Sequence, residues 1–208
     1  QGYGLTETAP YVSVLSSKDS VTKKGSAGKA LMFTEVCIVD ASGAVVPALE
    51  RGEICVSGPN VTAGYWGLEA ATRDAFDNRG WFLTGDIGYL DQDKCLFICD
   101  RAKDMVIRGG ENIYPVEIEN IIQSLPGVIG ACGFSVPSEK YGEELMVVVR
   151  VTPEEIHRID AKLIKQHCRK FLATFKVPSV ICVTDQIFPV NGANKVLKNE
   201  VKALFSSV

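Results

Sequence analysis

The sequence predicts an α+β protein with a β-rich first part and a compact second part in which helices and strands alternate. Short apolar runs between glycine-rich turns dominate residues 1–102, whereas apolar residues at helical spacing follow Pro115. Residues 100–115, at the junction, combine alternating charges, a short apolar run, a Gly-Gly pair and a helix start. We interpret this segment as a hinge that also carries binding groups. The predicted domains are residues 1–102 and 103–208, with the boundary at Lys103.

The composition is that of an ordinary globular protein, with 46% hydrophobic and 23% charged residues among 208. A net charge of −3 argues against a nucleic-acid partner and against binding to an anionic membrane surface. The longest apolar runs, 145–149 and 177–183, fall far short of the roughly 20 residues that span a bilayer, so we expect no transmembrane segment. Residues 1–10 lack the basic start and apolar stretch of a signal peptide.

The seven cysteines are an odd number, contain no CxxC pair, and lie mostly in apolar strand-like runs. Cys95 and Cys99 would stand about 13 Å apart along a strand, too far apart for one metal ion. We therefore favour buried, reduced thiols over the alternatives of disulfides or a metal site. Reduced thiols predict a reducing, cytoplasmic location.

Residues 2–8 (GYGLTET) place two glycines, an aromatic ring, two hydroxyls and a carboxylate on one short loop. Glycines let backbone N–H groups approach a phosphate, and Glu7 can hold Mg²⁺ through oxygen. Tyr3 can stack on a base. The alternative is a surface turn with an N-cap threonine, and these residues alone leave both open. Because the chain begins inside this loop without Met, we expect it to be a piece of a longer protein.

The next segment predicts short strands joined by turns. Residues 36–39 end at a hairpin-type turn, 40–43, and residues 53–58 form the following strand. This pattern indicates a small antiparallel unit, with a barrel as one possible form. Residues 68–76 predict a short helix.

Asp86 lies between two glycines after the apolar run 81–83. Its carboxylate can project from the turn and accept hydrogen bonds from a ligand diol, although aspartate in such a turn is more often a turn former. Residues 89–99 then predict a hairpin that leads into the hinge segment.

The second part predicts a helix that starts at Pro115 and ends at 126–127, with an apolar stripe. Residues 134–136, 145–151 and 180–183 are strand-like. A capping box at 152–155 predicts another helix, with the stripe Ile156, Ile159, Leu163, Ile164 and Phe171. Its two histidines, His157 and His167, fit a solvated face better than catalysis. A loop, 189–194, carries Lys195 into a terminal helix with Leu197, Val201 and Leu204 on one side.

Five motifs occur in order along nearly the whole chain: GYGLTET (2–8), GEICVSGPNVTAGYW (52–66), GWFLTGDIGYLD (80–91), DRAKDMVIRGGENIYPVEIE (100–119) and PVNGANKVLK (189–198). Together they resemble the C-terminal part of the adenylate-forming enzymes, which include acyl-CoA synthetases, aryl-CoA ligases, beetle luciferases and peptide-synthetase adenylation domains. The segment GGENIYPVEIE is more similar to the CoA ligases than to the peptide-synthetase domains. The resemblance implies the β-rich, barrel-like end of a large nucleotide-binding domain, followed by a small mobile C-terminal domain.

The resemblance also implies roles on the nucleotide side. Tyr3 would lie against the adenine, Thr6 would bind the α-phosphate and Glu7 would hold Mg²⁺. Asp86 would bind both ribose hydroxyls with help from Arg101. The flanking glycines of the first loop, which would border the acyl pocket, are Gly2 and Gly4.

On the mobile side, the resemblance makes Lys103 the pivot and Lys195 the lysine that contacts the acyl carboxylate and α-phosphate. The loop of Arg108, Gly109, Gly110 and Glu111 would face CoA. The family usually has Gly before the catalytic lysine, whereas this chain has Asn194, which tolerates the left-handed conformation better than most residues. Lys198 is the nearest competing lysine.

The resemblance implies an ATP- and Mg²⁺-dependent acyl-CoA synthetase, a ligase typical of fatty acid metabolism. It would join a carboxylic acid to CoA through an acyl-adenylate, with release of AMP and pyrophosphate. Two alternatives stay open: a carrier-protein or luciferase-type second step, or a non-catalytic fragment. The family's phosphate loop with its own lysine and most of the acyl pocket are absent, so we expect the 208-residue chain alone to be inactive. The missing N-terminal part of the same protein would supply them.

Overall fold

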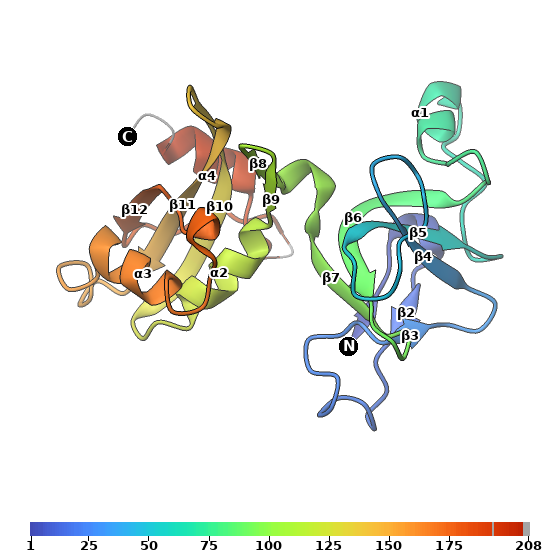
Figure 1. Ribbon diagram of the computed structural model, residues 1–208, viewed down its shortest axis with the longest axis horizontal. Helices are drawn as coiled ribbons and strands as arrows, with labels where there is room; N and C mark the ends of the chain where they lie inside the picture. Colours follow the sequence, from blue (N-terminus) through green and yellow to red (C-terminus); the bar gives the residue numbers. More distant parts are fainter. Residues whose placement is uncertain (193, 206–208) are drawn as a thin grey trace. The chain divides into compact units, whose positions relative to one another are not determined.

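The structure, a computed structural model, describes residues 1–192 and 194–205. The chain has the predicted α+β fold and divides into two compact units, Gln1–Lys103 and Asp104–Val208 (Figure 1). The sheets and the buried apolar clusters each lie within one unit, so each unit is described by itself.

The first unit contains two antiparallel sheets. The smaller one joins the short strands β1 (Gly2–Tyr3), β2 (Ser13–Val14) and β3 (Lys29–Ala30). The larger one follows chain order: β4 (Glu35–Val39), β5 (Gly52–Ser57), β6 (Phe82–Leu90) and β7 (Leu96–Arg101). In the described part of the chain this sheet is open, with β4 and β7 at its edges, and is not a closed barrel.

The core of the first unit explains why these strands pair as they do. Ile38 of β4 stands opposite Ile54 of β5, and both side chains are almost fully buried. Val56 and Leu96 complete the same cluster, together with Tyr3 of the first loop. Helix α1 (Glu69–Asp74) is shorter than the predicted 68–76 and has no buried residue. It projects from the sheet in Figure 1.

The second unit is built on a five-stranded mixed sheet. Its strand order is β10-β11-β8-β9, and β12 pairs in parallel with β11. The elements are β8 (Val106–Arg108), β9 (Glu111–Ile113), α2 (Pro115–Gln123), β10 (Val128–Ser138), β11 (Gly142–Val151), α3 (Ala161–Cys168), β12 (Val180–Thr184) and α4 (Lys198–Phe205).

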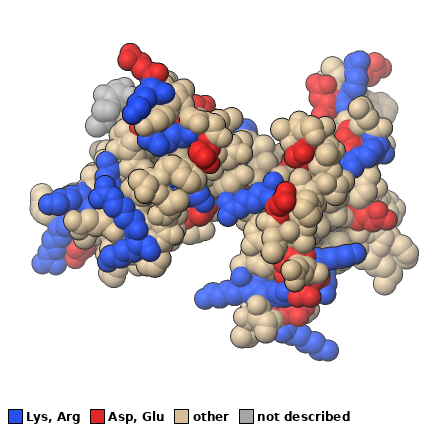
Figure 2. Space-filling view, in the orientation of Figure 1, with Lys and Arg blue, Asp and Glu red and all other residues tan. Residues whose placement is uncertain are grey.

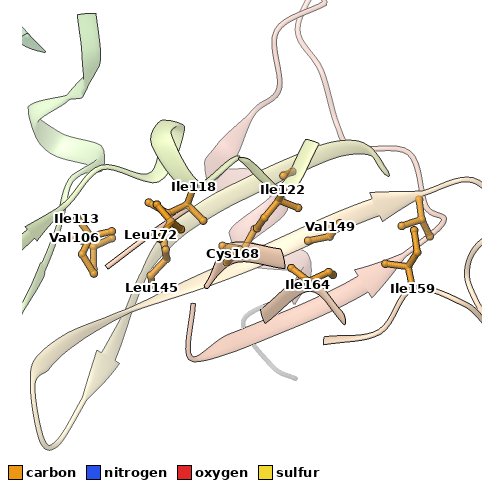
Figure 3. Packing of buried hydrophobic residues seen from close by; sticks show 13 residues of the cluster. Val106, Ile113, Ile118, Ile122, Leu145, Val149, Ile159, Ile164, Cys168 and Leu172 are labelled. Atoms are coloured by element: carbon orange, nitrogen blue, oxygen red, sulfur yellow. The ribbon is translucent and has the colours of Figure 1, made fainter. Parts of the chain in front are cut away.

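Strand β11 shows how sequence alternation fills two cores. Its odd-numbered residues, from Leu145 to Val151, face a cluster with Ile118 and Ile122 of α2 (Figure 3). The even-numbered Met146 and Val148 belong to a second cluster that includes Val201 of α4. The two apolar layers therefore lie on opposite faces of one sheet.

The predicted helix after Thr152 is wrong at its start. Residues 153–158 form turns, and α3 begins only at Ala161. Asp160 is its N-cap, because the carboxylate accepts the backbone N–H of Leu163 at 2.7 Å. The local cap therefore prevails over the capping-box pattern upstream.

Three members of the predicted apolar stripes are also wrong, and the first is Leu163 on α3, which is 39% exposed. Phe171 lies beyond the end of α3 and is 64% exposed, and Leu204 on α4 is 61% exposed. Phe205 is buried in place of Leu204. The neighbouring residue therefore takes the core position.

The seven cysteines are free thiols within the described residues, and four of them are buried. Burial raises the pKa of the Cys168 thiol to about 11. Figure 2 shows acidic side chains among the basic ones on the visible face of each unit. Across the described residues, no helix combines the length and the hydropathy needed to cross a membrane.

Candidate functional site

The first loop folds tightly around Gly4. A Cβ on this residue would stand 1.7 Å from the carbonyl oxygen of Pro10, so the close approach requires glycine. A 3₁₀ turn, η1 (Thr6–Thr8), follows, and the backbone N–H of Leu5 donates to Thr8 Oγ1 at 2.9 Å. Thr8 is buried, whereas Thr6 is exposed and Glu7 is half-buried. The turn therefore presents the two residues that the resemblance assigns to phosphate and metal.

Three predicted nucleotide-binding residues meet at Asp86. The Tyr3 hydroxyl donates to Asp86 Oδ2 at 2.7 Å, and Arg101 Nε lies 3.3 Å from Asp86 Oδ1. Asp86 and Arg101 are direct neighbours across β6 and β7. Burial raises the pKa of the Tyr3 hydroxyl well above its ordinary value, which keeps it a donor. The arrangement fixes a buried carboxylate beside an arginine.

A cavity of about 540 Å³ in the first unit is lined by Arg101 of this cluster, whereas the buried Tyr3 and Asp86 are not among its lining residues. Glu7, Arg101 and Lys103 line it, and Gly85, with φ of 70°, carries the chain past it into Asp86. The remaining lining residues are Leu5, Glu53, Tyr65, Asp74, Phe82, Leu83, Thr84 and Ala102. The cavity thus brings together predicted residues from the first loop and from the end of β7. A second cavity, of about 520 Å³, is lined by none of the predicted site residues.

Tyr65 is a cavity residue to which the sequence pattern gave no role. Its hydroxyl donates to Glu7 Oε1 at 3.0 Å. The backbone N–H of Thr62 donates to the Glu7 carbonyl at 2.8 Å, and Asn60 Nδ2 donates to the Thr8 carbonyl at 3.0 Å. The motif at 52–66 was the available signal, since it contains all three residues.

The second unit presents Lys195 on a short turn. Val190 and Val196 form a bridge, and the N–H of Lys195 donates to Asn191 Oδ1 at 2.9 Å. Asn194 has φ of 60°, the left-handed conformation expected where the family has glycine. The Lys195 side chain is exposed.

The competing lysine, Lys198, is held inside the second unit. Its ammonium lies 3.0 Å from Glu119 Oε1 and 3.4 Å from the carbonyl of Gly133, to which it donates. Glu119 also accepts the N–H of Gly133 at 2.8 Å. These contacts give Lys198 a structural place between α2, β10 and α4.

The predicted CoA-side loop is the turn between β8 and β9. Gly109 and Gly110 have φ of 59° and 89°, which favours glycine at both positions. Arg108 pairs with Glu144 at 3.0 Å and lies 4.0 Å over the Tyr141 ring. Arg108 is therefore anchored, whereas Glu111 at the other end of the turn is exposed.

The described residues contain no cluster of three or more His, Cys, Asp or Glu side chains suited to a metal ion. Glu7 lines the cavity together with two further carboxylates, Glu53 and Asp74. Mg²⁺ that arrives with a nucleotide is commonly held by one or two carboxylates together with substrate phosphates. A carboxylate of the first loop beside an open cavity fits that kind of site.

Comparison with known proteins adds independent findings. The model of the AMP-binding enzyme family matches residues 1–66, and the model of the AMP-binding enzyme C-terminal domain matches residues 117–195. The feruloyl-CoA synthase of an Amycolatopsis species is 44% identical over 99% of this chain and 41% of its own length. The long-chain-fatty-acid–CoA ligase FadD13 of Mycobacterium tuberculosis is 40% identical over 100% of this chain and 40% of its own length.

A solved structure agrees with these relatives. The O-succinylbenzoate coenzyme A synthetase of Bacillus subtilis, in complex with ATP and magnesium ion, superposes with a TM-score of 0.86 at 38% identity. The match covers 97% of this chain and 41% of that one. The chain thus spans about two-fifths of the length of the proteins it matches.

Proposed function

The chain belongs to the adenylate-forming AMP-binding enzymes, and from this we propose that it is the C-terminal portion of an ATP-dependent acyl-CoA synthetase. The enzyme would convert a carboxylic acid, ATP and CoA into acyl-CoA, AMP and pyrophosphate through an acyl-adenylate. The curated relatives named above are CoA ligases by name, which supports CoA as the acceptor rather than a carrier protein or oxygen.

The observation that carries this proposal is the cluster at Asp86. A buried carboxylate flanked by a tyrosine hydroxyl and an arginine can accept hydrogen bonds from a ribose diol. The adjoining cavity offers Glu7 from the first loop, and exposed Thr6 lies next to it in the chain. A nucleotide bound there would have its ribose at Asp86 and its phosphates toward η1.

Lys195 is proposed to act in the first half-reaction. A carboxylate that attacks the α-phosphate is an anion approaching an anion, and a lysine ammonium placed near both lowers that barrier. Its exposed position on a tight turn suits a side chain that must reach a substrate outside its own unit. Mg²⁺, when bound, would offset the charge of the pyrophosphate leaving group, with Glu7 as its protein ligand.

The second half-reaction needs a different surface, because the CoA thiol must reach the acyl carbonyl. The turn of Gly109 and Gly110, without side chains, would let an extended pantetheine chain pass close to the backbone. Lys103, at the boundary of the two units, is the proposed pivot that exchanges the Lys195 surface for this turn. We expect the 208-residue chain alone to be inactive, and we place the full enzyme in a reducing, cytoplasmic compartment.

The decisive experiment is Lys195→Ala in the full-length enzyme. Pyrophosphate exchange driven by the carboxylic acid should fall by about 10²–10³-fold, the loss typical of a group that stabilises transition-state charge. Thioester formation from supplied acyl-adenylate should stay near the wild-type rate, because that step does not use this lysine.

Lys162→Ala is the matched control, because it removes another exposed lysine of the second unit, on α3. It should leave both half-reactions intact. Wild-type pyrophosphate exchange in the Lys195→Ala enzyme would contradict the proposed role. A CoA-omission assay on the wild-type enzyme tests the acceptor separately.

A further inference from the structure

We propose that Tyr65 is a positioning residue that sets the orientation of the Glu7 carboxylate for a nucleotide-bound divalent cation. This inference rests on the proposed function and deepens it. It concerns a hydrogen bond between residues 58 positions apart, from the 52–66 motif to the first loop.

Tyr65 forms a hydrogen bond with one specific oxygen of the Glu7 carboxylate. Its hydroxyl donates to Glu7 Oε1 at 3.0 Å, and both side chains line the same cavity. With Oε1 engaged, the carboxylate can present Oε2 to the cavity. A hydrogen bond to one oxygen of a ligating carboxylate fixes its rotation, as outer-shell partners of metal ligands generally do.

The backbone of Glu7 is fixed independently of this bond. The N–H of Thr62 donates to the Glu7 carbonyl at 2.8 Å, and the N–H of Leu5 closes η1 on Thr8. The main chain of the turn therefore does not need the tyrosine hydroxyl. The backbone contacts leave the orientation of the Glu7 carboxylate undetermined, and the Tyr65 hydroxyl is positioned to fix that orientation.

Tyr65 is itself held from the side of α1. Its N–H donates to Thr72 Oγ1 at 2.9 Å. A Cβ at Gly64, where φ is 142°, would stand 2.4 Å from Thr72 Cγ2. The residue before Tyr65 is thus required to be small so that the loop can lie against Thr72. Helix α1 has no buried residue, and its contribution to the fold here is to anchor the Tyr65 loop through Thr72.

The chemistry of a phenol suits this task better than that of a cation. The Tyr65 hydroxyl donates to Glu7 as a neutral group. A neutral donor orients a carboxylate without cancelling the charge that attracts Mg²⁺. Asp86 has the opposite arrangement, with Arg101 beside it, as expected for a carboxylate that binds hydroxyls instead of a metal.

The test is Tyr65→Phe in the full-length enzyme, with binding measured by calorimetry. We expect the dissociation constant for ATP in the presence of Mg²⁺ to rise about 10-fold, the lower end of the loss seen on removing an outer-shell partner. The dissociation constant for AMP, measured in EDTA, should be unchanged, because AMP needs no metal. The Mg²⁺ concentration that half-saturates ATP binding should rise in parallel, and the melting temperature should stay constant.

Tyr89→Phe is the matched control, since it deletes a hydroxyl from a β6 residue that stacks on Phe97 and does not line the cavity. It should leave all four measurements at wild-type values. Equal weakening of ATP and AMP binding in Tyr65→Phe would mean that the hydroxyl only supports the loop, and would overturn the inference. Unchanged Mg²⁺ dependence would overturn it as well.

Failure of the proposed function gives a different result. In that case the wild-type enzyme would bind neither AMP nor ATP with Mg²⁺, and the inference would fall together with the function. Wild-type binding combined with an unaffected Tyr65→Phe variant would overturn the inference alone.

Discussion

Asn194 occupies the left-handed region, with φ of 60°, in the turn that carries Lys195. The sequence could anticipate this, because asparagine is the residue that best replaces glycine in that conformation. The competing lysine could not be dismissed in the same way. That Lys198 meets Glu119, a residue 79 positions earlier, depends on tertiary packing between α4 and α2.

Glu144 provides a pH-dependent prediction at the residue scale. A hydrogen bond with Ser179, followed by the Arg108 guanidinium, holds the pKa of this carboxyl below its ordinary value. A depressed folded-state pKa stabilises the fold above the unfolded pKa of about 4.3, and this contribution is lost as the pH falls through the folded pKa. Glu144→Gln should therefore reduce the free energy of unfolding by about 1 kcal/mol at pH 7.

Urea denaturation of the 208-residue chain at several pH values measures this difference. The gap between wild type and Glu144→Gln should shrink below pH 4. Glu111→Gln, at an exposed position in the neighbouring turn, is the control and should track the wild type. A gap that is constant with pH would show that ionisation of Glu144 contributes nothing.

At the scale of elements, the structure follows the sequence where periodicity and burial coincide. Helix α2 starts at the predicted Pro115, and Ile118 and Ile122 are fully buried as the spacing requires. Strand β10 is much longer than the predicted 134–136, because Gly130 and Gly133 conceal a strand that pairs with β11 along its length. Glycines interrupt the alternation of apolar and polar residues by which a strand is recognised in a sequence. The length of β10 is therefore determined by its pairing with β11.

The candidate site divides in a similar way. Residue types alone favoured a turn-forming role for Asp86, whereas the family resemblance carried by the five motifs implied that it binds the ribose. Neither the residue types nor the family resemblance could predict the contacts of Tyr65, because these contacts depend on how the 52–66 loop folds back onto η1. Spacing along the chain does not encode that contact.

Helix α3 carries the element-scale prediction. Asp160 caps it through the N–H of Leu163, so Asp160→Ala should cost about 1 kcal/mol of unfolding free energy. Asp160→Asn keeps an acceptor at the same place and should cost much less. Urea denaturation followed by circular dichroism measures both variants. An Asn variant as unstable as the Ala variant would contradict the capping role.

At the scale of the whole molecule, the division after Lys103 leaves each unit with its own apolar clusters. Such an arrangement allows the units to move as separate bodies. Lys103→Pro would fix φ near −65° and restrict Ala102 before it. In the full-length enzyme we expect this change to slow thioester formation about 10-fold or more while pyrophosphate exchange is largely spared.

Rapid-quench assays of the two half-reactions separate these effects. Lys103→Ala removes the side chain but keeps the backbone free, so it should preserve the thioester step better than the proline variant. Equal losses in both half-reactions after Lys103→Pro would argue against a pivot at this position.

The parallel pairing of β12 with β11 has a consequence for how the second unit assembles. Strands β10 and β11 are joined by a three-residue connection, so their pairing closes a short loop, whereas β12 must return across the segment that contains α3. Closing a longer loop costs more chain entropy before any contact rewards it. We therefore expect the β10–β11 hairpin to nucleate the unit and β12 to join late. Newly made chains would expose the edge of β11 during that interval.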